Sequence, residues 1–480
     1  MMKLWSWRTL ARVALVLWIA AITPSRVAAE GPTDDGERVA IAGAPAPGPS
    51  LYNQVWVRKY GPRDATHVLL LIPGSPAGQG NYDALAPALV ERVPDLAVWT
   101  LDRRGNALED VSIMAVGDPD LSLAYYAAPC SSGPDLCSGF TPWTGDSAPF
   151  VREWGAVVQL EDLRRVVLAA RHGGRRGVIL GGHSMGAVTV PTYAAWDFDG
   201  APGHLDLEAM VLIDGGQFNA FSKVLKDTPF ETPWATIADA AAALDTLATQ
   251  SPFGFAGPPL PVGASLWMVG VLPEIACQYA LKHSGQTSVL QPLAQFMEAL
   301  GLVPPNFVPQ DFAITNEAFA GRLFTSGLFS ALDVRAGALA ESGSPRPWLD
   351  GPFASVARVC QTFTKEPGNG LEWYYPIRLD MDLFLALASL RPTPVTAYLG
   401  LRPYHLSDIS LPLYVFETSL SQGGVLRAAR QLVRESQISQ YQLVSDESMG
   451  HFDPLGDVPE HNSFITSVVP FLRYVTRPRD

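Results

Sequence analysis

Short apolar runs recur along the chain, and the stretches between them place apolar residues at helical spacing. Residues 67–72 (HVLLLI) and 96–101 (LAVWTL) are continuous apolar runs that end in turn residues, a pattern typical of strands buried on both faces. Shorter runs predict further strands at 177–181, 209–214, 411–417 and 441–444. Helices are predicted at 82–93, 154–170, 187–196, 424–435 and from about 459 onward, where Pro470 is expected to kink or end the last helix. Strands that alternate with helices indicate an α/β fold with a parallel sheet and right-handed crossovers.

The alternation stops for a long central stretch. Residues 215–405 mix short helical segments with Pro/Gly turns, and the strand–helix pattern resumes after them. The simplest organisation is one α/β domain, formed by residues 51–214 and 406–480, into which residues 215–405 are inserted as a second, mainly helical domain. Residues 30–50 are interpreted as an N-terminal linker.

Composition narrows the class of protein. Hydrophobic residues make up 48% of the 480 residues, enough for a large core, which excludes a disordered acidic chain. The 34 Lys and Arg against 47 Asp and Glu give a formal net charge of −13, and the chain has no Lys/Arg-rich run that would neutralise phosphates. Nucleic acid is therefore not expected as a partner.

The N-terminal 29 residues resemble an export signal. Lys3, Arg8 and Arg12 precede an apolar run at 13–22, and the small residues up to Ala29 match the pattern that a signal peptidase cuts. The run would rise only about 15 Å as a helix, half a bilayer, so a cleaved signal is favoured over an uncleaved membrane anchor. Nothing later in the sequence is long and apolar enough to span a membrane. We expect a secreted or periplasmic protein.

The cysteine count agrees with an oxidising compartment. The chain has four cysteines, Cys130, Cys137, Cys277 and Cys360, and none lies in the signal segment. Four cysteines allow three pairings, among which the sequence does not choose. Pairing of Cys130 with Cys137 would close a local loop and leave Cys277 with Cys360 to tie distant parts of the chain together, a constraint worth about 4 kcal/mol. The spacings do not match a metal site, so zinc is not expected.

The pentapeptide Gly182-His183-Ser184-Met185-Gly186 carries the candidate chemistry. GxSxG alone is a weak signal, but here it directly follows a predicted strand and precedes a predicted helix. That setting is the strand, turn and helix of a nucleophile elbow, in which flanking glycines remove clashing side chains and a serine hydroxyl is exposed. The start of the helix adds positive potential and a free N–H group. The alternative interpretation is a Gly-rich turn with an inert serine.

With this motif the chain resembles the α/β-hydrolase superfamily, over most of residues 51–214 and 405–480. The resemblance implies an eight-stranded, mostly parallel sheet flanked by helices, with nucleophile, acid and histidine in that order along the chain. It makes Ser184 the nucleophile and His451, in the loop after the last predicted strand, the general base. It also makes residues 215–405 a lid between the sixth and seventh strands of the sheet.

The position of the acid stays open between two strands. Most members of the superfamily carry it just after the seventh strand, where Glu417 is the carboxylate available. Asp214 ends the sixth predicted strand and is followed by two glycines, which resembles the placement in haloalkane dehalogenases and some lipases. Either carboxylate would hold the Nδ1 proton of the imidazole. Asp214 is favoured, Glu417 is the alternative, and Asp446 and Glu447 rank below both.

Two backbone N–H groups are expected to bind the oxyanion. One belongs to Met185, and the other to Ser75 in the Pro73-Gly74-Ser75-Pro76 loop, which resembles the His-Gly-x-Pro loop of the superfamily. The alternative for this loop is an ordinary tight turn. The run Asp102-Arg103-Arg104-Gly105 resembles a charged turn of the aminopeptidase-like branch, and we interpret it as a salt-bridged structural turn.

These residues predict acyl transfer through an acyl-enzyme, without a metal or an organic cofactor. A lid rich in aromatic and aliphatic residues favours a small-molecule or polymer ester as substrate, so a secreted carboxylic ester hydrolase is the first hypothesis. The second is an aminopeptidase of the proline iminopeptidase or tripeptidyl-aminopeptidase type, for which Glu274, Glu317 and Glu341 are lid carboxylates available to hold an amine. The third is a catalytically silent hydrolase fold that serves as a binding protein.

Overall fold

The computed structural model describes most of the chain. The described ranges are 36–127, 139–256, 266–299, 305–326, 334–351, 354–364, 367–368 and 370–477. The predicted signal segment, residues 1–29, and the predicted Cys130–Cys137 pair lie outside the described residues. Among the helices in these ranges, none combines the length and apolar character needed to cross a bilayer.

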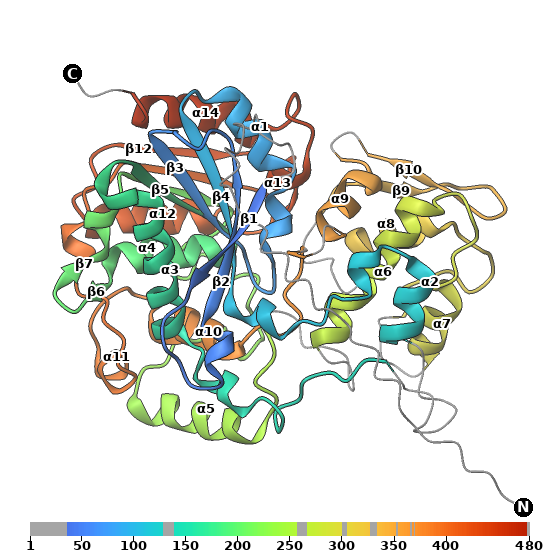
Figure 1. Ribbon diagram of the computed structural model, residues 1–480, viewed down its shortest axis with the longest axis horizontal. Coiled ribbons are helices and arrows are strands. Elements are labelled where there is room, and N and C mark those ends of the chain that lie inside the picture. Colours follow the sequence, from blue (N-terminus) through green and yellow to red (C-terminus); the bar gives the residue numbers. More distant parts are fainter. Residues whose placement is uncertain are drawn as a thin grey trace, which may run out of the picture.

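An eight-stranded sheet forms the centre of the larger body of the molecule (Figure 1). Its strand order is β1, β2, β4, β3, β5, β8, β11, β12. In chain order these strands are β1 (Glu37–Ala42), β2 (Gln54–Tyr60), β3 (His67–Ile72), β4 (Leu96–Asp102), β5 (Gly177–His183), β8 (Ala209–Ile213), β11 (Leu413–Glu417) and β12 (Tyr441–Ser445). β2 pairs antiparallel with β1 and β4, and all other neighbours are parallel. The predicted α/β fold with a mostly parallel, eight-stranded sheet is confirmed.

The sequence marks the buried strands of the sheet more clearly than it marks β1 and β2. β4 and β8 are buried along their whole length, as expected for continuous apolar runs in a parallel sheet. β1 (ERVAIA) and β2 (QVWVRKY) mix polar and apolar residues, because they form the antiparallel end of the sheet and leave part of their surface open. β1 lies inside residues 30–50, so this segment joins the sheet rather than serving only as the predicted linker.

Helices cover both faces of the sheet. α1 (Leu85–Arg92) and α14 (Ser463–Val475) pack against each other on one face, and α3 (Ala156–Arg171) and α4 (Met185–Ala195) cover the other (Figure 1). α12 (Gly424–Glu435) packs against β11 and β12. These helices lie where the apolar periodicity predicts them, with α4 starting two residues earlier than expected because it begins directly at the GxSxG turn.

Pro470 does not end the last helix, contrary to one of the two outcomes expected. α14 continues through it to Val475. Proline removes one backbone hydrogen bond from a helix, but buried side chains on both sides of it, including Val468 and Leu472, anchor the helix in the core. Packing therefore outweighs the loss.

The residues of the predicted insertion form two parts, which lie in different positions. Its larger part forms a separate lobe beside the sheet (Figure 1). This lobe contains α6 (Leu266–Lys282), α7 (Gln291–Ala299), α8 (Asn316–Ser326), β9 (Gly337–Leu339), β10 (Trp348–Asp350) and α9 (Val356–Phe363), and α2 (Pro119–Ser122) packs against α6. The smaller part, α5 (Ile237–Thr249), α10 (Ile377–Asp380) and α11 (Pro394–Tyr398), lies along the larger body.

A disulfide bond between Cys277 and Cys360 joins α6 to α9 inside the lobe. The two cysteines are 83 positions apart, and both are fully buried. This pairing is one of those that the sequence leaves open, and the structure selects it for the distant pair.

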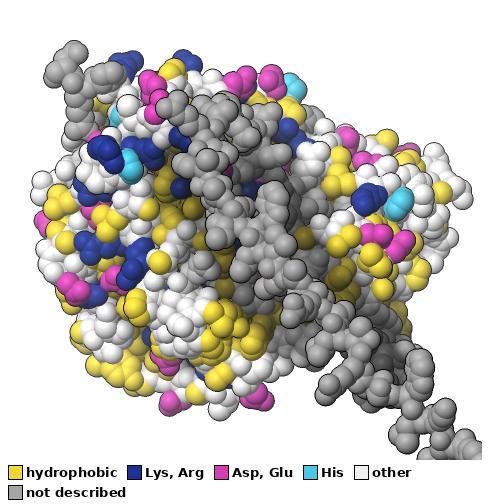
Figure 2. All heavy atoms as spheres, in the orientation of Figure 1, with side chains coloured by type: hydrophobic (Ala, Val, Ile, Leu, Met, Phe, Trp, Pro, Cys, Tyr) yellow, Lys and Arg dark blue, Asp and Glu magenta, His cyan; other side chains and the backbone are white. Residues whose placement is uncertain are grey.

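The surface of the larger body carries charges of both signs. Figure 2 shows Lys and Arg side chains interspersed with Asp and Glu side chains over this body, with apolar side chains between them. On the face drawn, the charges are therefore spread over the surface.

Candidate active site

The GxSxG pentapeptide forms a sharp turn between β5 and α4. Ser184 occupies the turn with φ 56° and ψ −122°, a backbone conformation that residues other than glycine rarely adopt. Its N–H donates to the carbonyl of Ile213 at 3.0 Å. A Cβ on Gly186 would lie 1.9 Å from the carbonyl oxygen of Ile72, and one on Gly182 would lie 2.3 Å from the carbonyl carbon of Gly186. The turn therefore requires both glycines of the motif. Ser184 remains partly exposed, as a nucleophile elbow requires.

His451 meets Asp214 at the carboxyl edge of the sheet. His451 lies in the loop between β12 and α13 (Asp453–Gly456), and Asp214 follows β8. Nδ1 of the imidazole lies 2.6 Å from Oδ2 of Asp214, and both side chains are buried. Because an ionised carboxylate only accepts hydrogen bonds, Nδ1 donates, and Nε2 of the neutral ring is left as an acceptor. The structure brings these two predicted residues together.

Thr418 completes the surroundings of Asp214. Its N–H donates to Oδ1 at 2.9 Å, and its hydroxyl donates to Oδ2. Burial raises the pKa of Asp214, but the hydrogen bond and charge of His451 and the hydrogen bonds from Thr418 outweigh it, so the pKa of Asp214 lies below its ordinary value. Asp214 is therefore an ionised, oriented partner for the imidazole.

Glu417, the alternative acid, has a different partner. Its Oε2 accepts the N–H of Leu426 in the first turn of α12 at 2.7 Å, where a negative charge is favourable. Asp446 accepts hydrogen bonds from Ser448 and from Ser463. Among the described residues, the carboxylate bonded to the imidazole of His451 is that of Asp214.

His183, the second residue of the motif, links the turn at Ser184 to the His451 loop. Its Nε2 lies 2.8 Å from the carbonyl oxygen of His451, and the centroids of the two rings are 4.3 Å apart. Burial, and next the neighbouring His451, lower the pKa of His183 to about 3, so this ring is neutral. In the part of the chain that the structure describes, no hydrogen bond joins the Ser184 hydroxyl to His451, and their loops are connected through His183. The sequence prediction missed His183, although its place beside Ser184 is a signal.

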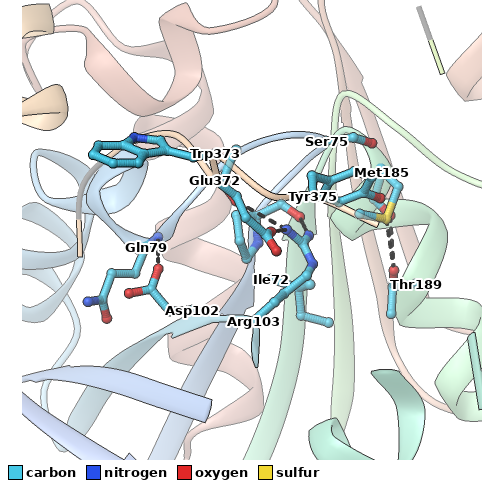
Figure 3. Close-up of polar contacts among 12 residues, drawn as sticks. Ile72, Ser75, Gln79, Asp102, Arg103, Met185, Thr189, Glu372, Trp373 and Tyr375 are labelled. Atoms are coloured by element: carbon cyan, nitrogen blue, oxygen red, sulfur yellow. Dashed lines mark hydrogen bonds and ion pairs between the residues drawn. The ribbon is translucent and has the colours of Figure 1, made fainter. Parts of the chain in front are cut away.

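The loop after β3, residues 73–79, lies against the same turn; we call it the oxyanion loop after the role predicted for it. A Cβ on Gly74 would lie 2.9 Å from Cβ of Ser184, so the loop backbone closely approaches the predicted nucleophile. Met185 begins α4, where the first N–H groups have no partner within the helix and the helix dipole is positive. Figure 3 shows Ser75 and Met185 on these two segments. Both predicted donors thus lie on segments that border Ser184.

The charged turn, residues 102–105, is buried and paired. Arg104 binds Asp162 through Nε at 2.7 Å and through Nη2 at 2.6 Å. Arg103 pairs with Glu372 of the insertion at 3.2 Å (Figure 3). These ion pairs agree with the interpretation of the run as a salt-bridged turn.

Two insertion carboxylates that the sequence prediction missed lie beside the oxyanion loop. Asp380 accepts hydrogen bonds from the hydroxyl of Ser75 at 3.0 Å and from that of Tyr375 at 2.5 Å. Burial raises the pKa of Asp380 to about 6, against the opposing effect of its hydrogen bonds. Burial also raises the pKa of Glu372 to about 7, although the charge of Arg103 opposes it. No local sequence pattern marks either residue, because their partners come from distant parts of the chain.

The three lid carboxylates considered for an amine site lie on different elements. Glu274, on α6, is buried and accepts the indole N–H of Trp373 at 2.9 Å. Glu317 is half-buried in the first turn of α8, and Glu341 is exposed between β9 and β10. The described contacts do not gather them into one site.

Phe221, a neighbour of the His451 ring, lines a small pocket that opens to solvent. Its walls come mainly from the segment after β8 and include Phe221, Leu225, Phe230 and Phe384. The ring of Phe221 also stands edge-on to His451, with 6.2 Å between centroids. The described residues contain no group of three or more His, Cys, Asp or Glu side chains that is arranged to hold a metal ion.

The strand order, the turn at Ser184 and the sequence order of Ser184, Asp214 and His451 together define an α/β-hydrolase fold. Comparison with protein-family models and with curated proteins finds no match.

Solved structures include several similar chains of low sequence identity. A Sulfolobus solfataricus protein provisionally assigned as a lipase is 13% identical, with a TM-score of 0.48, and the match covers 91% of this chain and 93% of that chain. Epoxide hydrolase A from Mycobacterium thermoresistibile is 13% identical, with a TM-score of 0.39 and coverage of 91% and 98%. The monoglyceride lipase of Saccharomyces cerevisiae is 10% identical, with a TM-score of 0.40 and coverage of 95% and 99%.

Proposed function

We propose that this protein is a serine hydrolase that cleaves carboxylic esters through an acyl-enzyme on Ser184. The observation that carries the proposal is the buried Asp214–His451 pair, 2.6 Å apart, beside a serine held in a strained turn. A strained serine conformation persists only where the surrounding structure enforces it, and such positions cluster at active sites. The glycine contacts at this turn supply that enforcement.

The proposed reaction has two halves. Ser184 Oγ attacks the ester carbonyl while Nε2 of His451 takes the hydroxyl proton, and the N–H groups of Met185 and Ser75 bind the oxyanion. His451 then returns the proton to the leaving alcohol, which leaves the acyl group on Ser184. A water molecule then gives a proton to His451 and attacks the acyl-enzyme, and the imidazolium returns this proton to Ser184 Oγ as the carboxylic acid is released. Asp214 holds the Nδ1 proton and stabilises the imidazolium in both halves.

An ester substrate, as a small molecule or a polymer, suits the apolar surroundings of the imidazole. Phe221 borders His451 and lines a pocket in which Leu225, Phe230 and Phe384 supply apolar surface beside polar residues such as Asn219. Apolar walls bind acyl or aromatic groups and exclude water, which strengthens the hydrogen bonds to an oxyanion.

The test compares a short p-nitrophenyl ester with an amino-acyl p-nitroanilide. We expect turnover of the ester, and a fall in kcat of about 10⁴-fold or more in Ser184→Ala and His451→Gln. His461→Gln, which changes an exposed histidine outside the site, is the matched control and should retain full activity. Cleavage of the anilide alone would overturn the proposal in favour of an aminopeptidase. Failure of a fluorophosphonate probe to label Ser184 in folded protein would favour a binding protein.

We further propose that the protein is exported after removal of residues 1–29. The buried Cys277–Cys360 disulfide supports this proposal, because such bonds persist in oxidising compartments. Mass spectrometry of the protein recovered from periplasm or medium should give an N-terminus near Glu30. Recovery of the full-length chain from membranes would contradict export as a cleaved protein.

A further inference from the structure

The oxyanion loop is paired along its outer edge with a segment of the insertion. The N–H of Gly78 donates to the carbonyl of Gly370 at 3.0 Å, and the N–H of Glu372 donates to the carbonyl of Pro76 at 2.9 Å. These bonds flank an antiparallel bridge between Ala77 and Leu371. The loop therefore forms a short two-stranded ladder with residues 370–372, nearly 300 positions away in sequence.

The inner side of the same loop rests on one arginine from the charged turn. The guanidinium of Arg103 donates to the carbonyl of Pro73 and, at 3.1 Å, to that of Ala77. These two carbonyls lie on either side of Ser75, the predicted oxyanion donor. Arg103 also stacks on the ring of Tyr375, 5.4 Å from its centroid, and its side chain is 1% exposed. A planar guanidinium has several donors in a fixed fork, so it spans both carbonyls at once.

Glu372 takes part in both sets of contacts. Its backbone N–H holds the outer edge of the loop, and its carboxylate lies 3.2 Å from Arg103, which holds the inner side. The carboxylate is fully buried and packs so closely on the charged turn that a Cβ on Gly105 would lie 2.0 Å from Oε1. Asp102 adds a further restraint, because it accepts the N–H of Gln79 at the end of the loop at 2.7 Å (Figure 3). Polar contacts therefore hold the loop along its outer edge, on its inner side and at its end.

We propose that Arg103 and Glu372 are positioning residues that hold the oxyanion loop against Ser184, so that the insertion is a working part of the catalytic site. This inference rests on the proposed function, because it concerns the N–H of Ser75 as an oxyanion donor. A displacement of about 1 Å in such a donor lowers the rate about 100-fold, since the hydrogen bond must meet the oxyanion where it forms.

The main test is Arg103→Lys in the full-length protein. Lysine keeps the charge but presents a single ammonium, which does not span Pro73, Ala77 and Glu372 together. We expect kcat for the p-nitrophenyl ester to fall about 100-fold, with KM changed by less than about threefold. The matched control is Arg104→Lys, which alters the neighbouring arginine of the same turn, with equal charge and near-equal burial, whose partner is Asp162 rather than the loop. This control should lower the melting temperature to a similar degree and leave kcat within about threefold of the original.

A second measurement does not depend on activity. Hydrogen–deuterium exchange of the peptide that contains residues 74–79 should speed up in Arg103→Lys and stay unchanged in Arg104→Lys. Glu372→Gln, which keeps the shape of the side chain, covers the case in which Arg103→Lys fails to fold, and we expect it to raise exchange in this peptide and to lower kcat about tenfold.

The outcomes separate this inference from the proposed function. Equal losses of kcat in both lysine variants, or unchanged exchange at residues 74–79 in Arg103→Lys, would overturn the positioning role. If the unaltered protein and Ser184→Ala show the same low ester turnover, the proposed function falls, and the exchange experiment still decides whether Arg103 and Glu372 hold the loop.

Discussion

At the residue scale, the candidate site depends on the conformations of two carboxylates that end neighbouring strands. β8 and β11 pair in parallel register, which brings Asp214 and Glu417 to the same edge of the sheet. Asp214 adopts a left-handed conformation with φ 41°, leaves the strand and meets His451. Glu417 is still part of β11, and its side chain turns to the start of α12. Asp214 therefore binds the imidazole, whereas Glu417 binds the start of a helix.

Replacement of each carboxylate by its amide should affect activity in one case and stability in the other. Asp214→Asn should lower kcat for the ester by about 10³- to 10⁴-fold, because asparagine neither fixes the tautomer of His451 nor stabilises its cation. Glu417→Gln should leave kcat within about threefold and cost about 1 kcal/mol of unfolding free energy, since a charge at a helix N-terminus is lost. Steady-state kinetics and thermal melts of both variants provide the comparison. A large kcat loss in Glu417→Gln alone would reverse the assignment.

At the element scale, the turn between β5 and α4 is possible because the helix and β3 approach each other closely at Gly186. A methyl group there would press on the backbone of Ile72, which does not move without displacing β3. Gly186→Ala should therefore destabilise the protein by about 3 kcal/mol and abolish ester hydrolysis. Gly285→Ala is the control, because a Cβ at Gly285 meets no atom within 4 Å, and it should change the stability by less than about 1 kcal/mol. Denaturant melts would report both values, and equal effects would contradict the steric argument.

The elements also show how far the sequence predicts this structure. The buried strands, their helices and the turn at Ser184 are predictable because each has a local pattern: a continuous apolar run, helical spacing or paired glycines. β1 and β2 lack such a pattern, since an antiparallel edge strand mixes polar and apolar residues. The partner of His451 is not decided by sequence, because it depends on how Asp214 leaves its strand.

Long-range contacts set the remaining limit on prediction. Glu372 supports the oxyanion loop through Arg103, a residue 269 positions away, and nothing in the sequence around either residue indicates this pairing. His183 is recognisable only as a neighbour of Ser184 until the fold places its ring against His451.

At the scale of the whole molecule, the insertion meets the larger body at several places, and two of these seams lie at the candidate site. One seam joins residues 370–380 to the oxyanion loop. The other lies at the His451 loop, where the backbone N–H of Arg335 donates to Asp453 at 3.1 Å and the guanidinium of Arg358 donates to the carbonyl of Gly456 at 2.6 Å. Movement of the insertion would therefore disturb both the oxyanion loop and the His451 loop.

The second seam makes the stability of the protein depend on pH. Asp457 is 1% exposed, and its two carboxylate oxygens have no hydrogen-bond partner among the described residues. Burial, together with the negative charges of Asp453 and Asp446, raises the pKa of Asp457 to about 8, although the charge of Arg358 opposes this shift. The folded protein therefore keeps this proton up to about pH 8, whereas an unfolded aspartate releases it near pH 4. The native state consequently loses stability as the pH rises between these values.

Asp457→Asn should remove this loss. We expect the variant to melt at least about 2 °C above the unaltered protein at pH 9, with a smaller difference at pH 5. Asp64→Asn, at an exposed aspartate, should leave the pH dependence of the melting temperature unchanged. Parallel curves for the Asp457 variant and the unaltered protein from pH 5 to 9 would contradict the argument.

The long sequence distances within the candidate site have a consequence for the growing polypeptide. His451 is 237 positions downstream of Asp214, and Glu372 also emerges well after Ser184. At about 10 residues per second, a ribosome needs more than about 20 seconds to add the histidine after the aspartate. Under the proposed function, a nascent chain therefore has Ser184 but neither His451 nor Glu372, and it would gain ester hydrolysis only when translation is almost complete.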